Sequence, residues 1–362
     1  MLSSISEPTM SGGVIVRPKV REAYRQVLRH IRAEGLGPGS RLPAQEDLVE
    51  RLGLCSATIS RAMRVFSEEG VVTRKRGVGT VICEPERALQ TVWAVALACE
   101  EHAGGGFHSA LKERVRNGLV HGGCVDRTFL PPLGRAASSL LCRSMDGFVG
   151  LRAAVSRREV DAIVTLFLEA VQDSPVPALA VGAVGPRESG VFVDVGGFVM
   201  NAFQELRRRG SRCVALITWG DEQSNPTACR AYSAAMERHG RGDGEGGVLY
   251  GFQDLDGGRA AAETLLQRPP EDRPDGLVLT EDYPAAGTCE RLRAAGDYRP
   301  RIAVMTNKQL PLSYSLPVLH FENDLDLLAA EVVKMVKDRL LDPEMGDVVK
   351  MITPALEDES GG

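Results

Sequence analysis

The feature that most constrains the fold is a long alternation of short apolar runs and helical stretches, which begins near residue 92 and continues almost to the C-terminus. Repeated strand–helix–strand order with continuous apolar strands predicts parallel sheets that helices cover on both faces. About 260 residues of this pattern exceed what one sheet usually needs, so we expect two similar lobes. The expected strands are 92–98, 162–167, 178–181, 213–217, 247–250, 276–279 and 302–305, and the expected helices are 198–209, 227–239, 258–267, 285–295 and 325–341.

The N-terminal part has a different pattern, that of three helices followed by a hairpin. Apolar residues recur with a helical period through residues 20–31, and a glycine- and proline-rich stretch ends this first helix. A second helix fits residues 45–52 and a third fits 56–69, with a glycine after each. Two short strands, 71–73 and 80–82, flank a basic turn. This order predicts a winged helix-turn-helix, which is an α+β domain.

Charge is distributed unevenly along the chain. The net charge is −5, but residues 19–82 carry 12 Lys and Arg against 7 Asp and Glu, which leaves −10 for the remainder. A basic head on an acidic body favours a polyanionic partner for the head alone, since phosphate neutralisation supplies most of the sequence-independent affinity for nucleic acid. A solvated basic surface is the alternative.

Five stretches of this head resemble the GntR family of regulators, namely 42–48, 52–54, 58–63, 69–72 and 77–81. The resemblance spans about 65 residues and implies that the third helix enters the major groove of DNA, while the wing reaches the minor groove. It implies DNA contacts from Arg41, Ser56, Ala57, Thr58, Ser60, Arg61, Arg74, Lys75, Arg76 and Gly77. Short hydroxyl side chains at a helix N-terminus can bond phosphates or base edges, and arginine can bind guanine through two hydrogen bonds.

The head departs from the family pattern at three positions. Ser56 and Ser60 stand where the family commonly has Arg, and Ala44 stands where it has a capping Ser. Base reading could therefore be redirected through Arg61, so the operator sequence does not follow from the resemblance. Ser56 could also act simply as a helix cap, and Arg64 could be a solvated side chain.

The body resembles the LacI-type effector domain, which is itself similar to periplasmic sugar-binding proteins of type I. The resemblance rests on residues 193–197, 206–217, 274–283 and the helix that follows Asn323 and Asp324. It implies an α/β body of two lobes around a cleft, with a ligand bound where loops meet the carboxyl ends of the strands.

Four residues are candidates for contacts with that ligand. Asp282 matches the family's ligand-contacting Asp, although it could instead cap the helix that follows. Trp219 and Phe252 follow strands and could stack on a ring or pack in the core. The family's ligand-binding Arg aligns with Ala228, which leaves Arg230 one turn-face away, so the pocket could bind something unlike the common sugars or bind nothing.

The sequence divides into a flexible leader at 1–17, a winged helix-turn-helix domain at 18–83, a linker at 84–91, an effector-binding and dimerisation domain at 92–356 and a flexible tail at 357–362. Eight scattered cysteines include no C-x-x-C pair, so neither a zinc site nor a disulfide framework is expected. No export signal or membrane-spanning stretch is evident, which indicates a cytoplasmic protein. Nucleotide-binding, hydrolase and metalloprotease motifs are also missing, so we expect no enzyme activity, catalytic residue, metal or cofactor.

Together these patterns predict a DNA-binding transcription regulator, a repressor, that binds a palindromic operator as a homodimer. A small molecule, such as a sugar or a related metabolite, would modulate its operator affinity. Two alternatives stay open. One is a DNA-binding regulator whose degenerate sensor serves only as a dimerisation scaffold, and the other is a solute-binding protein that does not bind DNA.

Overall fold

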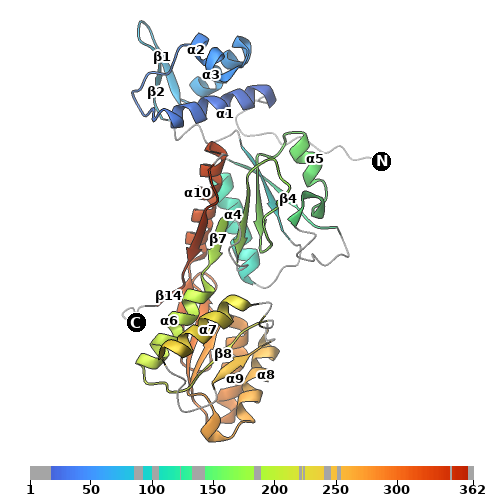
Figure 1. Ribbon diagram of the computed structural model, residues 1–362, viewed down its shortest axis with the longest axis vertical. Helices are drawn as coiled ribbons and strands as arrows, with labels where there is room; N and C mark the ends of the chain where they lie inside the picture. The colour runs from blue at the N-terminus through green and yellow to red at the C-terminus, as the bar shows by residue number, and fades with distance from the viewer. Residues whose placement is uncertain are drawn as a thin grey trace.

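The computed structural model describes residues 18–84, 93–99, 106–122, 124–132, 143–182, 189–219, 222, 225–239, 246–250, 254–342 and 345–357. Three units follow one another along the long axis of the molecule (Figure 1). A small unit of three helices and a hairpin, called the head, lies at one end. The α/β lobe next to it is called the upper lobe, and the distant one is called the lower lobe.

The head consists of α1 (Pro18–Ala33), α2 (Gln45–Leu52), α3 (Ser56–Glu68), β1 (Val72–Lys75) and β2 (Gly79–Ile82). Its core centres on Tyr24 and Phe66, whose rings stack with their centroids 3.9 Å apart. The Tyr24 hydroxyl also donates a hydrogen bond to Glu69, which follows α3. Gly53 ends α2 with φ at 63°, a left-handed conformation that glycine adopts without steric cost. This tight turn brings α3 into place directly after α2.

The two strands of the head form an antiparallel hairpin, called the wing. Arg74 pairs with Thr80, and Lys75 pairs with Gly79 next to the turn. The Leu42 N–H donates to the Thr80 carbonyl at 2.9 Å, so the segment before α2 lies along the wing. The predicted three-helix-plus-hairpin order, and with it the winged helix-turn-helix fold, is confirmed.

Each lobe contains a six-stranded sheet. The upper sheet has the order β13-β7-β6-β5-β3-β4, and all of its neighbouring strands are parallel. The lower sheet has the order β14-β12-β11-β10-β8-β9, and β14 is its antiparallel strand. The upper strands are β3 (Ala94–Ala98), β4 (Val125–Phe129), β5 (Ala162–Leu166), β6 (Ala178–Gly182), β7 (Gly190–Val193) and β13 (Val349–Ile352), and the lower strands are β8 (Val214–Ile217), β9 (Gly247–Leu249), β10 (Gly276–Leu279), β11 (Arg301–Asn307), β12 (Leu319–Asn323) and β14 (Ala355–Leu356).

Helices pack against both sheets. They are α4 (Gly106–His121), α5 (Leu151–Ser156), α6 (Val195–Arg208), α7 (Pro226–His239), α8 (Leu255–Leu266), α9 (Asp282–Ala295) and α10 (Leu325–Leu341), with short 3-10 turns at Met145–Gly147 and Pro270–Asp272. Strands β3, β5, β8 and β10 are buried at every residue, as expected for parallel strands inside such a layered fold. Among the described residues, no helix has the length and apolar character needed to cross a bilayer.

The chain passes between the lobes at three places, after β7, after β12 and after β13. Asp194 follows β7 and caps α6 through a 2.8 Å hydrogen bond from the Gly197 N–H. Its other carboxylate oxygen accepts from the Thr353 hydroxyl at 2.8 Å, which ties the first crossing to the third. Asp324 caps α10 in the same way at the second crossing. Side-chain hydrogen bonds therefore fix all three segments on which the lobes could pivot.

Helix α1 of the head rests on the upper lobe. Arg25 forms an ion pair with Asp161, and both side chains are buried. The Arg25 guanidinium also lies 4.5 Å from the centroid of the Trp93 ring, a cation–π contact. Arg32 donates to Asp338 on α10 at 3.2 Å. These contacts join α1 directly to the upper lobe.

The predicted strands and helices of the body are all present, with ends that differ by up to three residues, and α10 matches its expected range. The parallel two-lobed α/β body is confirmed. Sequence patterns missed α4, α5, β4, β7 and the three strands β12, β13 and β14. Strand β4 illustrates the reason: it lies at a sheet edge and its three central residues are polar, so it has no continuous apolar run.

Candidate DNA interface and ligand cleft

Helix α3 has one buried face and one exposed face. Ile59, Ala62 and Met63 are buried in the head core. The opposite face presents Ser56, Ala57, Ser60 and Arg61 as exposed residues, with Thr58 partly buried. The residues predicted to contact DNA therefore share one accessible surface.

Two of the small residues on this helix are also held by local bonds. Gln45 Nε2 on α2 donates to Ser56 Oγ at 2.9 Å, which ties the two helices together. The Thr58 hydroxyl lies 2.9 Å from the Cys55 sulfur, and Cys55 occupies the N-cap position of α3. Ser56 is the first helical residue, so the alternative in which it caps α3 does not apply.

Arg41 lies alongside strand β2 of the wing. A Cβ atom added at Gly79 would lie 3.0 Å from Arg41 Nε, so the guanidinium passes directly over this glycine. The φ of +105° at Gly79 also disfavours any residue with a side chain. Gly79 therefore helps to place Arg41, a role that sequence reasoning did not assign.

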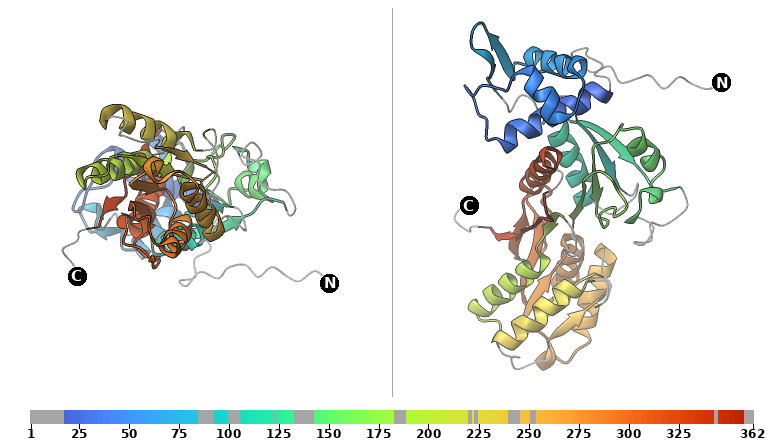
Figure 2. Two further views of the ribbon diagram at one scale, coloured as in Figure 1. Left: turned by 90° about the horizontal axis from the view of Figure 1, so that it is seen from below. Right: turned by 45° about the horizontal axis from the view of Figure 1, so that its top comes forward.

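Two groups of basic side chains in the head differ in their surroundings. Those on α1 face the body, where Arg21 donates to the Arg158 carbonyl and Arg25 and Arg32 form ion pairs. Those of the second group are exposed and form no ion pair with any described residue: Arg41, Arg61, Arg74, Lys75 and Arg76. Figure 2 shows the wing, which carries three of them along with Gly77, projecting at the end of the molecule opposite the lower lobe. We call this second group, together with the exposed face of α3, the DNA face.

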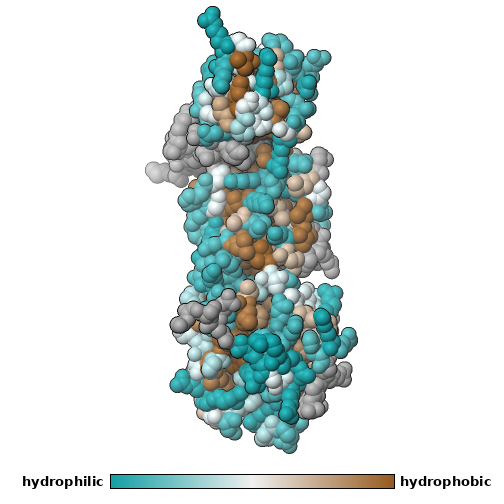
Figure 3. Space-filling model, turned by 90° about the vertical axis from the view of Figure 1, so that its left-hand side faces the viewer, coloured by the Kyte–Doolittle hydropathy of each residue, from teal (hydrophilic) through white to brown (hydrophobic). Residues whose placement is uncertain are grey.

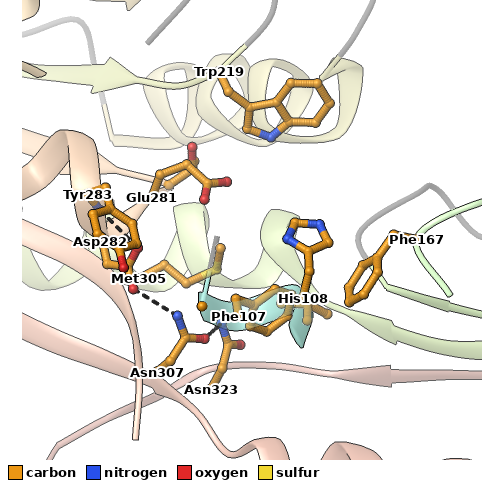
Figure 4. A pocket seen from close by; sticks show the side chains of 13 residues that line it. Phe107, His108, Phe167, Trp219, Glu281, Asp282, Tyr283, Met305, Asn307 and Asn323 are labelled. Atoms are coloured by element: carbon orange, nitrogen blue, oxygen red, sulfur yellow. Dashed lines mark hydrogen bonds between the residues drawn. The ribbon is translucent and has the colours of Figure 1, made fainter. Parts of the chain in front are cut away.

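A pocket of about 380 Å³ lies between the lobes, at the carboxyl ends of the strands (Figure 4). Its volume is within the range of about 300 to 1,000 Å³ that is common for small-molecule sites. We call this pocket the cleft. Its described lining consists of Gly106, Phe107, His108, Phe167, Val193, Trp219, Thr280, Glu281, Asp282, Tyr283, Met305, Asn307 and Asn323.

The upper-lobe wall of the cleft is aromatic. Phe167 follows β5, and its ring contacts His108 and Phe107 of α4 with centroids 3.9 and 5.7 Å apart. Phe167 has φ at 62°, a left-handed conformation that costs a non-glycine residue about 1–2 kcal/mol. Gly182 allows this placement, because a Cβ there would lie 2.8 Å from Phe167 Cδ1. Burial lowers the pKa of His108, which favours the neutral ring.

The lower-lobe wall carries a chain of polar groups. Asn307 Nδ2 donates to Asp282 at 2.9 Å, and Asn323 Nδ2 donates to Asn307 Oδ1 at 3.4 Å. The Asn323 side-chain oxygen is buried and has no hydrogen-bond partner among the described residues. The three strand ends thus present linked donors and acceptors to a ligand.

Two neighbouring carboxyl groups dominate the electrostatics of this wall. Burial, reinforced by the charge of Asp282, raises the pKa of Glu281 to about 8. Burial also raises the pKa of Asp282, while the hydrogen bond from Asn307 opposes the shift. Asp282 begins α9, and its own carboxylate accepts from the adjacent Tyr283 N–H at 2.9 Å. It forms no N-cap bond, so the capping alternative does not apply.

Of the residues predicted to contact a ligand, Asp282 and Trp219 line the cleft. Arg230 lies on the exposed side of α7, where its Nε donates to the Pro226 carbonyl at 3.2 Å, and it does not line the cleft. Phe252 lies outside the described residues. Sequence reasoning missed Glu281, Phe107, His108, Phe167, Asn307 and Asn323. The position of the two asparagines at the ends of apolar strands was the signal that could have found them.

The winged helix-turn-helix head defines a GntR-type transcription regulator, and the two-lobed α/β body has the LacI-like fold. The profile described as "Bacterial regulatory proteins, gntR family" matches residues 19–82. The HTH-type transcriptional regulator Rv1152 of Mycobacterium tuberculosis is 34% identical over 88 residues, which are 24% of this chain and 70% of that protein. The chain belongs to the GntR family.

Other curated relatives match over the head and little else. The histidine utilization repressor of Pseudomonas aeruginosa is 31% identical over 74 residues, or 20% of this chain. The chain spans 30% of the length of that repressor, and 25% and 37% of the repressors of the same name from Klebsiella aerogenes and Pseudomonas putida.

Solved structures match the fold of the body. A LacI transcriptional regulator from a Rhodococcus species covers 73% of this chain, and the chain covers 96% of it, with a TM-score of 0.55 and 20% identity. The structure of the regulator CelR in complex with cellobiose aligns with 89% of this chain and along its own full length, with a TM-score of 0.57 and 21% identity. The structure of a dimeric Lac repressor aligns with 73% of this chain and with 97% of its own length, with a TM-score of 0.58 and 14% identity. At these identities the likeness shows the fold alone.

Proposed function

We propose that the protein is a sequence-specific transcription repressor, which binds a palindromic operator as a homodimer and responds to a small molecule in the cleft. The DNA face carries this proposal. Its five exposed cations form no ion pair within the described residues, whereas the cations of α1 are used against the upper lobe. Unpaired cations around an exposed helix and a projecting hairpin suit phosphates and base edges.

Exposed apolar residues support the homodimer. Leu327 on α10, Val348 and Val349 at β13 and Leu356 on β14 are between 36% and 46% exposed. Figure 3, which views the side of the molecule that carries α10, shows apolar surface on the upper lobe. The similar Lac repressor structure is described as dimeric. A two-fold dimer would place two α3 helices on two half-sites.

Coupling between the cleft and the DNA face would run through the upper lobe. A ligand that touches Trp219 and Asp282 on one lobe and Phe167 on the other favours one lobe arrangement. The Arg25–Asp161 pair would carry the displacement of the upper lobe to α1. Operator affinity then changes only as far as the ligand distinguishes the two arrangements.

The effector is a small organic molecule that fits a cleft of about 380 Å³. Sugars are one candidate class, because carboxylates and amides bond hydroxyl groups and because the CelR structure contains cellobiose.

The experiment is selection of duplexes from a random pool by the purified full-length chain at physiological salt. We expect enrichment of a palindromic site that binds two chains, and an Arg41→Ala variant that binds this site more weakly. Arg212→Ala removes the same charge from an exposed position on the lower lobe and serves as the control. Failure to enrich any sequence would overturn the proposal.

A second candidate is a DNA-binding regulator whose cleft no longer senses a ligand. The buried Ala228 favours it, because that residue stands where the resemblance places a ligand-binding Arg. A metabolite pool that never changes the operator affinity of the full chain would favour this second candidate. A solute-binding protein without DNA affinity is disfavoured by the unpaired cations of the DNA face.

A further inference from the structure

The charged residues of the cleft are of one sign. Among the described lining residues, Glu281 and Asp282 are acidic and none is Lys or Arg. The Glu281 carboxyl group forms no hydrogen bond or ion pair with any described residue, and Figure 4 shows it pointing into the cavity beneath the Trp219 ring. An unpaired carboxyl group in a partly closed site is costly to ionise unless a positive charge joins it.

The remaining walls suit an organic cation. Phe107, Phe167, Trp219 and Tyr283 line the same cavity, and aromatic faces attract ammonium groups. Two carboxyl groups are too few for a metal ion such as calcium, which takes about six to eight oxygen ligands. The described residues contain no cluster of three or more potential metal ligands.

We propose that the cleft binds a protonated amine with an apolar or aromatic body, whose ammonium group sits between Glu281, Asp282 and the Trp219 ring. This inference rests on the proposed function, because it names the effector class of the same cleft. Asn307 and Asn323 would form hydrogen bonds with further polar atoms of the ligand. Asn307 donates to Asp282, and the buried side-chain oxygen of Asn323 has no partner among the described residues.

One feature of the cleft opposes a cation. Helix α4 begins at Gly106 beside the cavity, and a helix N-terminus carries roughly half a positive charge. Two carboxylates outweigh that partial charge. The α4 end suits an electronegative atom at the far end of the ligand, so the two ends of the cleft differ in polarity.

The test uses calorimetric titration of the full-length chain with matched probes. Phenethylamine is a cation at neutral pH, 2-phenylethanol is its neutral counterpart, 3-phenylpropionate is an anion, and cellobiose represents a sugar. Tryptamine and agmatine extend the amine series. We expect at least one amine to bind roughly tenfold or more tightly than every neutral or anionic probe, as desolvated charge pairs do.

Two substitutions test the role of the carboxyl groups. Glu281→Gln and Asp282→Asn keep the shape of each side chain and should weaken amine binding by roughly tenfold, while 2-phenylethanol changes little. Glu290→Gln removes a charge from the exposed surface of the same helix, α9, and should leave the amine unaffected.

Binding of an amine should also release a proton. Glu281 is largely protonated at neutral pH when the cleft is free, because its pKa is about 8, and a cation would drive it to ionise. Amine affinity should therefore rise between pH 6 and 8, where an alkylamine stays protonated. The other titratable groups near this carboxyl are Asp282, Tyr283, His108 of α4 and Tyr314, whose pKa burial and Asp282 raise.

Several results would overturn the inference. These are tighter binding of a neutral or anionic probe, absence of binding by every amine, or equal losses for phenethylamine and 2-phenylethanol in Glu281→Gln. A sugar that binds the cleft and changes operator affinity would refute the amine and leave the proposed regulator intact. If the chain binds an amine but selects no operator, the proposed regulator is refuted and the amine site stands.

Discussion

The DNA face and the cleft are opposite in almost every physical respect. The DNA face is cationic and exposed, and its residues lie within a contiguous stretch from Arg41 to Gly77. The cleft is acidic and partly enclosed, and its residues come from helix N-termini and strand ends between Gly106 and Asn323. A site built from one local motif can be located from sequence, whereas a site assembled by sheet topology requires the fold.

The largest expected effect on stability comes from weakening the Arg25–Asp161 pair, which joins the head to the upper lobe and so links the DNA face to the cleft. Asp161→Asn leaves the buried Arg25 with Glu22, 3.7 Å away, as its remaining carboxylate, which should destabilise the contact between head and upper lobe by about 3 kcal/mol. The asparagine oxygen can still accept the 2.9 Å hydrogen bond from the Ala94 N–H, so the loss reports the charge. Chemical denaturation of the full-length chain measures it.

Glu159→Gln is the matched control for this substitution. Glu159 pairs with Arg127 at 2.7 Å, but both side chains are more than a third exposed. Its loss should cost at most about 1 kcal/mol. Equal effects from the two substitutions would show that the Arg25–Asp161 pair does not hold the head to the upper lobe.

The next largest effect is expected on operator affinity, when Arg61 is removed from the exposed face of α3. Arg61→Ala should weaken operator binding by about 1–3 kcal/mol, or roughly five- to 150-fold, if Arg61 contacts a base edge. Affinity for a random duplex should fall much less, because phosphate contacts are independent of sequence. Fluorescence anisotropy with both duplexes makes the comparison, and equal losses would limit Arg61 to the phosphate backbone.

The acidic cleft predicts a pH effect on stability that the DNA face does not share. The pKa of Glu281 is raised from 4.5 to about 8, so the folded chain holds a proton that the unfolded chain has lost. Protonation therefore stabilises the fold, and the contribution of Glu281 disappears as pH rises towards 8. Between pH 6 and 8, stability relative to a Glu281→Gln variant should fall by about 2 kcal/mol.

Both the unaltered protein and Glu281→Gln contain His108, so the difference between their stabilities reports the contribution of Glu281 alone. The lowered pKa of His108 acts in the opposite direction, since its contribution is lost as pH falls. Melting curves recorded across this pH range provide the measurement. Parallel profiles for both proteins would mean that Glu281 has an ordinary pKa.

The smallest effect is expected for Arg230, an exposed cation that does not line the cleft. Arg230→Ala should change the affinity of the cleft for any ligand by less than about twofold, because Arg230 is exposed on α7 and does not line the pocket. The same calorimetric titration used for the carboxyl variants tests it. A loss as large as that of Asp282→Asn would place Arg230 at the ligand.

Sequence patterns predicted most of the elements that had a strong period. The helix at 325–341 and the apolar strands β3 and β10 are examples. Edge strands such as β4 and β13 were missed, because partial exposure mixes polar residues into their sequences.

The same contrast holds for the sites. All ten predicted DNA-contacting residues lie in the head, where local spacing sets their positions, and their contact with DNA stays a prediction. Asp282 was found by its place in a motif, but its neighbour Glu281 carries no signal until burial is known. Phe107 and Asn307 lie 200 positions apart in the chain, and only the folding of the two sheets brings them to one cavity.

The most direct test of the central claim is the salt dependence of operator binding. The logarithm of affinity should fall linearly with the logarithm of salt concentration, by about 0.9 for each phosphate contact. Removing two wing cations with Arg74→Ala and Lys75→Ala should reduce that slope by about 2, while Arg212→Ala leaves it unchanged. An operator affinity and a salt slope equal to those of the unaltered protein would show that the wing does not meet DNA.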